Sequence, residues 1–414
     1  MPAEVKYQRH IEEKLRESFT LWGYEEVRSP TIEYLETLST DLGSELAQSM
    51  FKFQDFDGRM LALRPEMTTP VARMITTRMF STPEPIRLFY ISNVFRYSRS
   101  YAERGREFWQ AGVELIGCDG DRADGEVISL LASSLRELGL NQLRLDLGHA
   151  GLFKKMQKSA RLDSEKEQIF RTLIGRRDRV ELEKFMSTND FPSELKKLVL
   201  DLCEIRKLRE AASALDRRSS FRKAKRFARA LSAVADVLSD YHLEDEVYFD
   251  FSLTGRIEYY TGIVFEASVP GFGFSIGAGG RYDDLLWKLS EIRTPAVGFA
   301  IEIEKCLQAL HSQGSRLSTI PDDDVRVLVN SISNERAVET ASLLRKSGVV
   351  AITEVTDRTR KKLIEYGKLA RMNYIVVVES DRKKPLVIYD VQSGTKRRLP
   401  TRGFLQEIRR SRAE

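Results

Sequence analysis

Apolar residues recur at helical spacing near the start of the chain. Ile11, Leu15, Phe19 and Trp22 are separated mainly by charged and polar residues, and Gly23 follows them. Because residues three and four positions apart lie on one face of a helix, this pattern predicts an amphipathic helix that stops at Gly23.

The next part of the chain changes character at about residue 150. Up to that point, the runs at 87–92 and 144–147 indicate strands, and the apolar spacing at 125–138 indicates a helix. Residues 151–240 are instead rich in Lys, Arg, Glu and Leu and contain few glycines. This second stretch is typical of a helical insertion.

The C-terminal third divides at a polar segment. Strand-like, glycine-rich sequence covers 247–280, and a helix is expected near 296–310. The segment 314–324 carries Gly and Pro and is typical of a linker. After it come expected strands at 325–330, 349–354, 374–379 and 386–390, and expected helices at 335–347, 358–370 and 403–410. This alternation predicts a small α/β domain.

The bulk composition is that of an ordinary soluble protein. The 414 residues are enough for two or three domains, and the formal net charge is +5. No apolar run approaches the ~20 residues of a membrane helix, and the first ten residues lack the apolar core of a signal peptide. Cys118, Cys203 and Cys306 lie far apart, which disfavours a zinc site and a disulfide framework. We expect a cytoplasmic protein without a metal site or a membrane segment.

Four sequence blocks carry the candidate chemistry. They are LALRPEMTTPVAR at 61–73, NVFRYSRSYAERGREFWQAGVELIG at 93–117, LTGRIEYYTGIVFEA at 253–267, and IGAGGRYDDLL with TPAVGFAIEIEKCL at 276–286 and 294–307. Each block alone is a weak signal, but together, in this order, they resemble the histidyl-tRNA synthetase family.

The resemblance covers nearly the whole chain and implies its architecture. The implied fold class is α/β (α+β), with a class II aminoacyl-tRNA synthetase-like antiparallel sheet core at 1–315. The helical insertion at about 151–240 interrupts this core, and an anticodon-binding-like α/β domain follows at 325–414. Cores of this kind usually dimerise, so a homodimer is expected.

The resemblance also implies a pocket for free histidine. Histidine carries an amine, a carboxylate and an imidazole, so a pocket needs a carboxylate, polar groups for the ring and an aromatic wall. By the family pattern, Glu66 and Gln110 contact the backbone groups of the amino acid, and Glu114 and Tyr260 contact the imidazole. The full expected set is Glu66, Thr68, Gln110, Glu114, Tyr259, Tyr260, Gly279 and Arg281.

Each of these residues also has an ordinary structural interpretation. Gln110 and Glu114 could form a half-exposed strand face, and Tyr259 and Tyr260 could be core and surface tyrosines. The glycine-rich run 277–280 could be only a tight turn. These interpretations are favoured for each residue alone, whereas the joint match favours the pocket.

The positions that would handle ATP match the family less well. Activation of an amino acid places negative charge on phosphate, which arginine stabilises best. Arg96, Arg104 and Arg106 match basic positions of the family. However, Gly255 and Lys305 stand where the family has arginines, and Glu302 stands where it has a glycine.

These departures predict a chain without catalytic residues. Arg256 is displaced by one residue from the arginine position, and a shift of one residue turns a strand side chain to the opposite face. Lys305 keeps the charge but loses the bidentate fork. The alternative is that Lys305 and Arg256 are repositioned locally and that activation persists.

Several phrases are more similar to a second branch of the family, the regulatory subunits of ATP phosphoribosyltransferase. They are RPEMTTPVAR, REFWQAGVELIG, ADGEVISLL, GHAGLF and YYTGIVFEA. This resemblance implies a non-catalytic histidine sensor in the first step of histidine biosynthesis. It also implies L-histidine as effector, no cofactor, and the short-form catalytic subunit as partner in a homodimer or larger hetero-oligomer.

The alternative function is an active histidyl-tRNA synthetase that uses ATP and Mg. The C-terminal domain supports it, because many regulatory-branch members lack one. Basic stretches at 358–362, 396–398 and 217–229 would suit RNA phosphates. They also suit a solvated helix face, and the modest net charge disfavours tRNA binding without excluding it.

Overall fold

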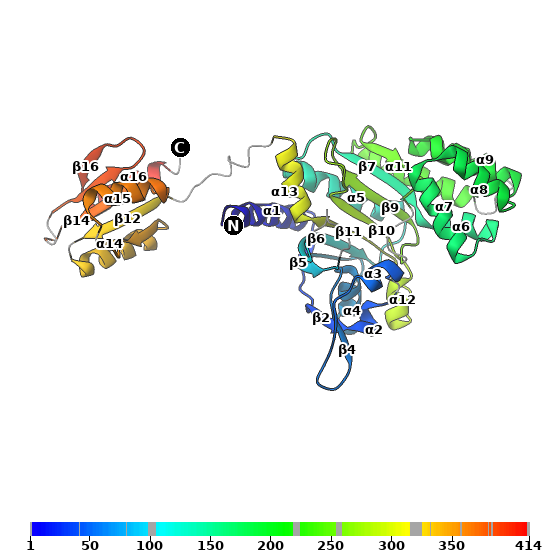
Figure 1. Cartoon of the computed structure of the whole chain (residues 1–414), viewed down its shortest axis with the longest axis horizontal. Coiled ribbons are helices and arrows are strands. Elements are labelled where there is room, and N and C mark those ends of the chain that lie inside the picture. Colours follow the sequence, from blue (N-terminus) through cyan, green and yellow to red (C-terminus); the bar gives the residue numbers. More distant parts are fainter. Residues whose placement is uncertain are drawn as a thin grey trace. The chain divides into compact units, whose positions relative to one another are not determined.

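The computed structural model divides the chain into two compact units, Met1–Leu317 and Ser318–Glu414 (Figure 1). No described helix is long and apolar enough to cross a membrane. The structure describes residues 2–40, 42–79, 81–97, 105–217, 224–253, 259–314, 325–331, 333–356, 358–379, 381 and 384–411.

An eight-stranded sheet forms the centre of the first unit. Its six inner strands pair antiparallel with one another, and each of the two edge strands pairs in parallel with its single neighbour. In spatial order the strands are β1 (Glu25–Glu26), β5 (Ile86–Phe95), β6 (Glu107–Ile116), β11 (Ala296–Glu302), β10 (Gly277–Arg281), β9 (Ile263–Ser268), β7 (Arg144–His149) and β8 (Val247–Phe249). The predicted antiparallel sheet core is thereby confirmed.

Three helices cover one face of this sheet: α1 (Pro2–Leu21), α5 (Asp121–Glu137) and α13 (Ile303–Ser312) (Figure 1). The apolar stripe of α1 is buried as its spacing predicted. Phe19 packs with its ring centroid 5.6 Å from that of Phe89 on β5 and 5.9 Å from that of Phe299 on β11. Burial of such apolar surface is the main stabilising contribution to the unit.

The opposite face of the sheet is covered by smaller elements. Helix α4 (Thr68–Arg78) packs closely with α12 (Leu285–Ser290), and Leu88 and Tyr90 of β5 belong to the hydrophobic core between these helices and the sheet. The elements on this side are β2 (Ile32–Tyr34), α2 (Leu35–Leu38), α3 (Ser44–Gln48), β3 (Lys52–Gln54), β4 (Met60–Leu63), α4 (Thr68–Arg78) and α12 (Leu285–Ser290).

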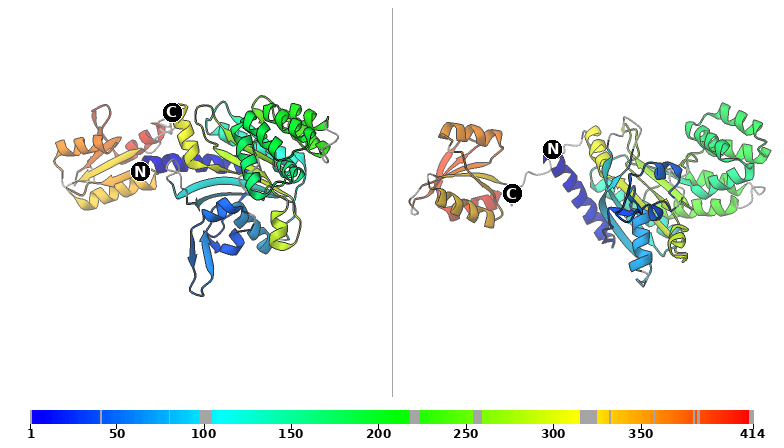
Figure 2. Two further views of the ribbon diagram at one scale, coloured as in Figure 1. Left: turned by 45° about the vertical axis from the view of Figure 1, so that its right-hand side comes forward. Right: turned by 60° about the horizontal axis from the view of Figure 1, so that its bottom comes forward.

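The described residues of the predicted helical insertion form six helices (Figure 2). Phe153, Phe170, Phe185 and Phe191 pack together inside it, with Phe170 fully buried. The helices are α6 (Ala150–Ala160), α7 (Ser164–Arg176), α8 (Arg179–Thr188), α9 (Ser193–Glu204), α10 (Leu208–Asp216) and α11 (Ala224–Asp240).

The helix expected near 296–310 is wrong in its first half. Residues 296–302 form β11, and the helix α13 begins only at Ile303. Because β11 lies between β6 and β10, both of its faces are buried, and Val297, Gly298 and Phe299 read as a continuous apolar run. Such a run does not distinguish a buried strand from a buried helix.

The second unit is a five-stranded sheet with helices on both faces (Figure 2). The predicted α/β domain is confirmed, with one strand missed, β16, because its sequence KRRL is largely polar. In spatial order the strands are β13 (Val350–Thr353), β12 (Arg326–Ser331), β14 (Tyr374–Val378), β15 (Leu386–Asp390) and β16 (Lys396–Leu399), and the helices are α14 (Asn334–Lys346), α15 (Arg360–Leu369) and α16 (Thr401–Ser411).

Candidate functional site

Glu66 lies at the start of α4 with its carboxylate tied to the helix. The backbone N–H of Thr68 donates to Glu66 Oε2 at 2.7 Å, and that of Thr69 donates to Oε1 at 2.9 Å. The first N–H groups of a helix lack intrahelical partners and favour a negative charge. This geometry fixes a buried carboxylate, 3% exposed, at one end of the site.

Glu114 provides a second buried carboxyl group on β6. The Thr68 hydroxyl donates to Glu114 Oε1 at 2.7 Å, and the Tyr282 hydroxyl donates to Oε2. Burial raises the pKa of Glu114 to about 8, against the opposing effect of the Tyr282 and Thr68 hydrogen bonds. This carboxyl group therefore changes protonation state close to neutral pH.

Four tyrosines surround the two acids. Tyr259 lies with its ring 5.0 Å from Tyr260 and 5.5 Å from Tyr282, and its hydroxyl donates to Glu66 Oε2 at 3.5 Å. Tyr90 is buried beneath them, and burial together with Glu114 raises its pKa. Tyr282 was expected at the pocket only through its place directly after the glycine-rich run 277–280, and Tyr90 was not expected there. Aromatic type alone does not distinguish them from core tyrosines.

Three glycines keep the sheet surface open under these side chains. A Cβ at Gly298 would overlap the Glu114 carboxylate, one at Gly280 would overlap the Tyr260 ring, and one at Gly112 would overlap Tyr90. The sequence gives no direct signal for this role, because the overlap occurs with residues on neighbouring strands or loops. These glycines explain how two carboxyl groups and several rings fit on one sheet face.

Gln110 lies on the same face of β6 as Glu114, since the two are four residues apart on a strand. It is 4% exposed, and its Oε1 accepts no hydrogen bond from the residues that the structure describes. A half-exposed strand face is therefore wrong for both residues. An unsatisfied buried acceptor costs about 1–3 kcal/mol, so this position suits a ligand that donates an N–H.

Gly279 and Arg281 do not share this face. Gly280 faces Tyr260, so its neighbours along the strand face the other side of the sheet, where a Cβ at Gly279 would meet Phe265. Arg281 Nε donates to Asp124 Oδ1 at 2.8 Å, and its Nη1 donates to Asp283 Oδ1 at 3.1 Å. The prediction that Gly279 and Arg281 line the histidine pocket is therefore wrong.

The basic positions expected near ATP are only partly described. Arg96 Nε donates to the carbonyl of Pro65 at 2.6 Å, and its guanidinium lies 5.0 Å from the Phe108 ring centroid. Arg106 lies over Tyr97 at 5.4 Å. The remaining positions, Arg104, Gly255 and Arg256, lie outside the described residues.

Glu302 and Lys305 form an ion pair at the end of β11. Lys305 Nζ lies 2.8 Å from Glu302 Oε2, and the side chains are 22% and 25% exposed. Glu302 lies directly opposite Gln110 in the β6–β11 register, as Gly298 lies opposite Glu114. Residues directly opposite in an antiparallel pair share a face, so the Glu302 carboxylate belongs to the site face of the sheet.

Some of the basic residues considered for RNA contacts are paired internally. Arg358 donates to Glu354 at 2.7 Å, and Arg397 donates to Glu407. In the basic stretch 217–229, residues 218–223 lie outside the described residues. Among the residues described, no group of three His, Cys, Asp or Glu side chains could hold a metal ion.

The family model of histidyl-tRNA synthetase matches residues 1–306. The chain belongs to the histidyl-tRNA synthetase family. It is 38% identical to the ATP phosphoribosyltransferase regulatory subunit of Halothermothrix orenii, over 86% of each chain. It is 33% identical to the histidine–tRNA ligase of Pyrococcus abyssi, over 99% of this chain and 96% of the ligase.

A solved structure has the same fold. It is a protein of Bacillus halodurans described as an ATP phosphoribosyltransferase regulatory subunit/histidyl-tRNA synthetase. The TM-score is 0.77 at 27% identity, and the match covers 92% of this chain and 96% of the other.

Within the histidyl-tRNA synthetase family, the described site therefore has two parts of different character. The part around Glu66 and Glu114 brings together acids, hydroxyls and rings suited to a small polar zwitterion. At the other part, the cation of Lys305 is paired with the carboxylate of Glu302.

Proposed function

We propose that this chain is a cytoplasmic regulatory subunit of ATP phosphoribosyltransferase that binds L-histidine and does not charge tRNA. The observation that carries the proposal is the contrast between Glu114 and Lys305. Glu114 lies in a closed network of hydroxyl donors beside Glu66, whereas Lys305 is neutralised by Glu302. The naming of the Halothermothrix orenii relative as a regulatory subunit supports the same conclusion.

Histidine would be recognised by its two ends. The Glu66 carboxylate and the unsatisfied Oε1 of Gln110 would accept hydrogen bonds from the ammonium group. The Glu114 carboxyl group would hydrogen-bond one imidazole nitrogen beside the Tyr260 ring. Because burial already holds these groups in place, little conformational entropy is lost when the ligand binds.

Regulation would follow from differential affinity for two states of the complex. Histidine binds one arrangement of the regulatory and catalytic subunits more tightly, and a difference of about 1–3 kcal/mol shifts the population toward the inactive arrangement. The partner would be the short-form catalytic subunit, in an assembly built on a homodimer of this chain. No cofactor is needed for this role.

An active histidyl-tRNA synthetase is the second candidate. Arg96 is retained, and the Pyrococcus abyssi ligase matches 99% of this chain, which includes the second unit. This function would require ATP and Mg, and the cations that contact phosphate would have to act without the fork of an arginine at Lys305.

Reconstitution with a short-form catalytic subunit tests the proposal. The two purified chains are expected to elute together in size-exclusion chromatography, and the mixture should transfer the phosphoribosyl group at least tenfold faster than the catalytic chain alone. Added histidine should then inhibit the mixture. The Glu114→Gln variant is expected to retain stimulation but to lose inhibition by histidine, and the surface variant Glu107→Gln should retain both. Absence of stimulation would contradict the proposal.

A further inference from the structure

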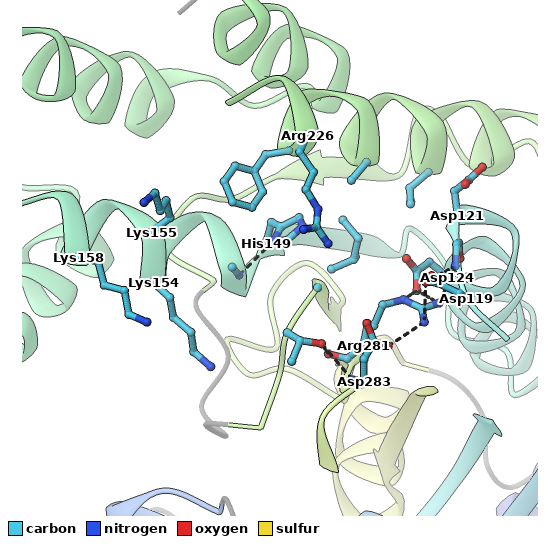
Figure 3. A pocket seen from close by; sticks show the side chains of 18 residues that line it. Asp119, Asp121, Asp124, His149, Lys154, Lys155, Lys158, Arg226, Arg281 and Asp283 are labelled. Carbon is cyan, nitrogen blue, oxygen red and sulfur yellow. Dashed lines mark hydrogen bonds and ion pairs between the residues drawn. The ribbon is translucent and has the colours of Figure 1, made fainter. Parts of the chain in front are cut away.

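A cavity of about 390 Å³ lies where the helical insertion meets the sheet (Figure 3). Helices α6 and α11 form one wall, and the start of α5 with the end of β10 forms the other. Its volume falls within the range of about 300–1,000 Å³ that is typical of small-molecule sites. All of its lining residues belong to the part of the chain that the structure describes.

The wall formed by α6 and α11 carries four cations. Lys154, Lys155 and Lys158 come from α6, and Arg226 comes from α11 (Figure 3). Lys155, Lys158 and Arg226 make no ion pair with any residue that the structure describes. Four like charges around one cavity repel each other, and a phosphate group would relieve this repulsion with charge-assisted hydrogen bonds.

His149 lines the cavity together with these four cations and is itself uncharged at neutral pH. Burial and the nearby Arg226 lower the pKa of His149 to about 4, and its Nδ1 accepts the backbone N–H of Gly151 at 3.1 Å. Its ring lies 4.9 Å from the Phe227 ring in an edge contact. His149 and Phe227 thus add an uncharged, aromatic surface beside Arg226, which suits the uncharged body of a ligand.

The opposite wall is acidic but partly neutralised. Arg281 is held between Asp124 and Asp283, so those two carboxylates already have a cation. The carboxylate of Asp121 has no hydrogen-bond partner among the described residues, and Thr261 lines the same wall. A carboxylate repels phosphate but accepts hydrogen bonds from hydroxyl groups, so the two walls together select a ligand with an anionic end and a hydroxyl-bearing end.

We propose that this cavity binds a small phosphorylated sugar, with its phosphate toward the cations of α6 and α11 and its hydroxyl groups toward the acidic wall. The cavity adjoins the candidate histidine site through one residue. Lys154 Nζ donates to the carbonyl of Tyr260 at 3.0 Å, while the Tyr260 ring lies over Gly280 on the Glu114 side. The Lys154 side chain, which lines the cavity, therefore directly contacts a residue of the candidate histidine site.

Calorimetry with D-ribose 5-phosphate on the full chain tests this site, without histidine and at low ionic strength because salt screens exposed charges. A dissociation constant below about 1 mM is expected. D-ribose and inorganic phosphate should each bind at least tenfold more weakly. The variant Arg226→Gln with Lys158→Gln should lose at least tenfold in affinity. Its matched control, Lys225→Gln with Arg229→Gln, removes the same charge from exposed positions on α11 that do not line the cavity and should bind normally.

Three results would overturn the inference. One is absence of ribose 5-phosphate binding to the unaltered chain. Another is equal affinity for inorganic phosphate, which would leave the acidic wall without a role. The third is an equal loss in the matched control, which would indicate non-specific attraction to net charge. None of these results depends on whether the chain binds histidine.

Discussion

Lys305 Nζ lies 2.8 Å from Glu302 Oε2 across the junction of β11 and α13. The resemblance to the histidyl-tRNA synthetase family led us to expect a glycine and an arginine at these two positions, and the structure pairs the residues that stand there. The carboxylate that would repel a triphosphate is neutralised by the cation that would attract it. Reversal of either substitution alone therefore leaves the other residue without its partner.

The pair predicts a small, measurable coupling energy. Both side chains are about one quarter exposed, so solvent screens their attraction, and a coupling of about 1 kcal/mol or less is expected. A double-mutant cycle with Glu302→Gln and Lys305→Met, followed by urea unfolding, measures it. A coupling above about 2 kcal/mol would contradict the pairing as an ordinary half-exposed ion pair.

Glu114→Gln is expected to weaken histidine binding at least tenfold. The substitution keeps the shape of the side chain but replaces one carboxyl oxygen with an amide nitrogen. Because that nitrogen accepts no hydrogen bond, the side chain cannot accept from both the Thr68 and the Tyr282 hydroxyl groups. Calorimetry with histidine measures the loss. Glu107→Gln is the matched control, because Glu107 lies on the same strand at an exposed position. Equal affinities in the two variants would remove Glu114 from the site.

The raised pKa of Glu114 predicts a pH dependence of folding. Its pKa is about 8 in the folded chain and near 4.5 when unfolded, so the folded state binds the proton more tightly. The resulting stability is complete below about pH 4.5 and is lost as pH rises through 8.

Glu114→Gln cannot ionise and therefore lacks this dependence. Relative to the unaltered chain, it should gain at least about 1 kcal/mol in free energy of unfolding between pH 5.5 and pH 8.5, since one pKa unit corresponds to about 1.4 kcal/mol. Urea unfolding at the two pH values tests this. Parallel behaviour of the two proteins would contradict the assigned direction.

Gly298→Ala should abolish histidine binding. An added Cβ would overlap the Glu114 carboxylate, so either the acid moves or β11 shifts, at a cost of about 1–3 kcal/mol. Calorimetry and urea unfolding on the same sample separate loss of the site from loss of folding. Gly175→Ala on α7 is the control, because nothing lies within 4 Å of its new methyl group. That variant should bind normally and be slightly more stable.

Local periodicity predicted the elements whose two faces differ. Helix α1 has one buried stripe and was recognised from Ile11, Leu15 and Phe19. Strand β11 is buried on both faces and has no such contrast, and β16 is too polar to show one. Whether such a segment forms a strand depends on the elements that pack against it, and its own residues do not specify those elements.

The candidate site could likewise be predicted from the sequence only in part. The acids Glu66 and Glu114 could be named from residue type and motif, because few other residues can bind an ammonium or an imidazole. The roles of Gly280 and Gly298 depend on side chains of other segments that face them. Arg281 was misplaced because the face that a strand residue occupies depends on the register of the whole sheet.

Histidine-dependent exchange of pyrophosphate into ATP tests the central claim most directly. The assay uses the purified full chain, with a histidine–tRNA ligase such as that of Pyrococcus abyssi as the positive control, and calorimetry on the same preparation establishes histidine binding. The account predicts that histidine binds while exchange stays at the level of a blank. Robust histidine-dependent exchange would contradict it and would identify the chain as an active synthetase.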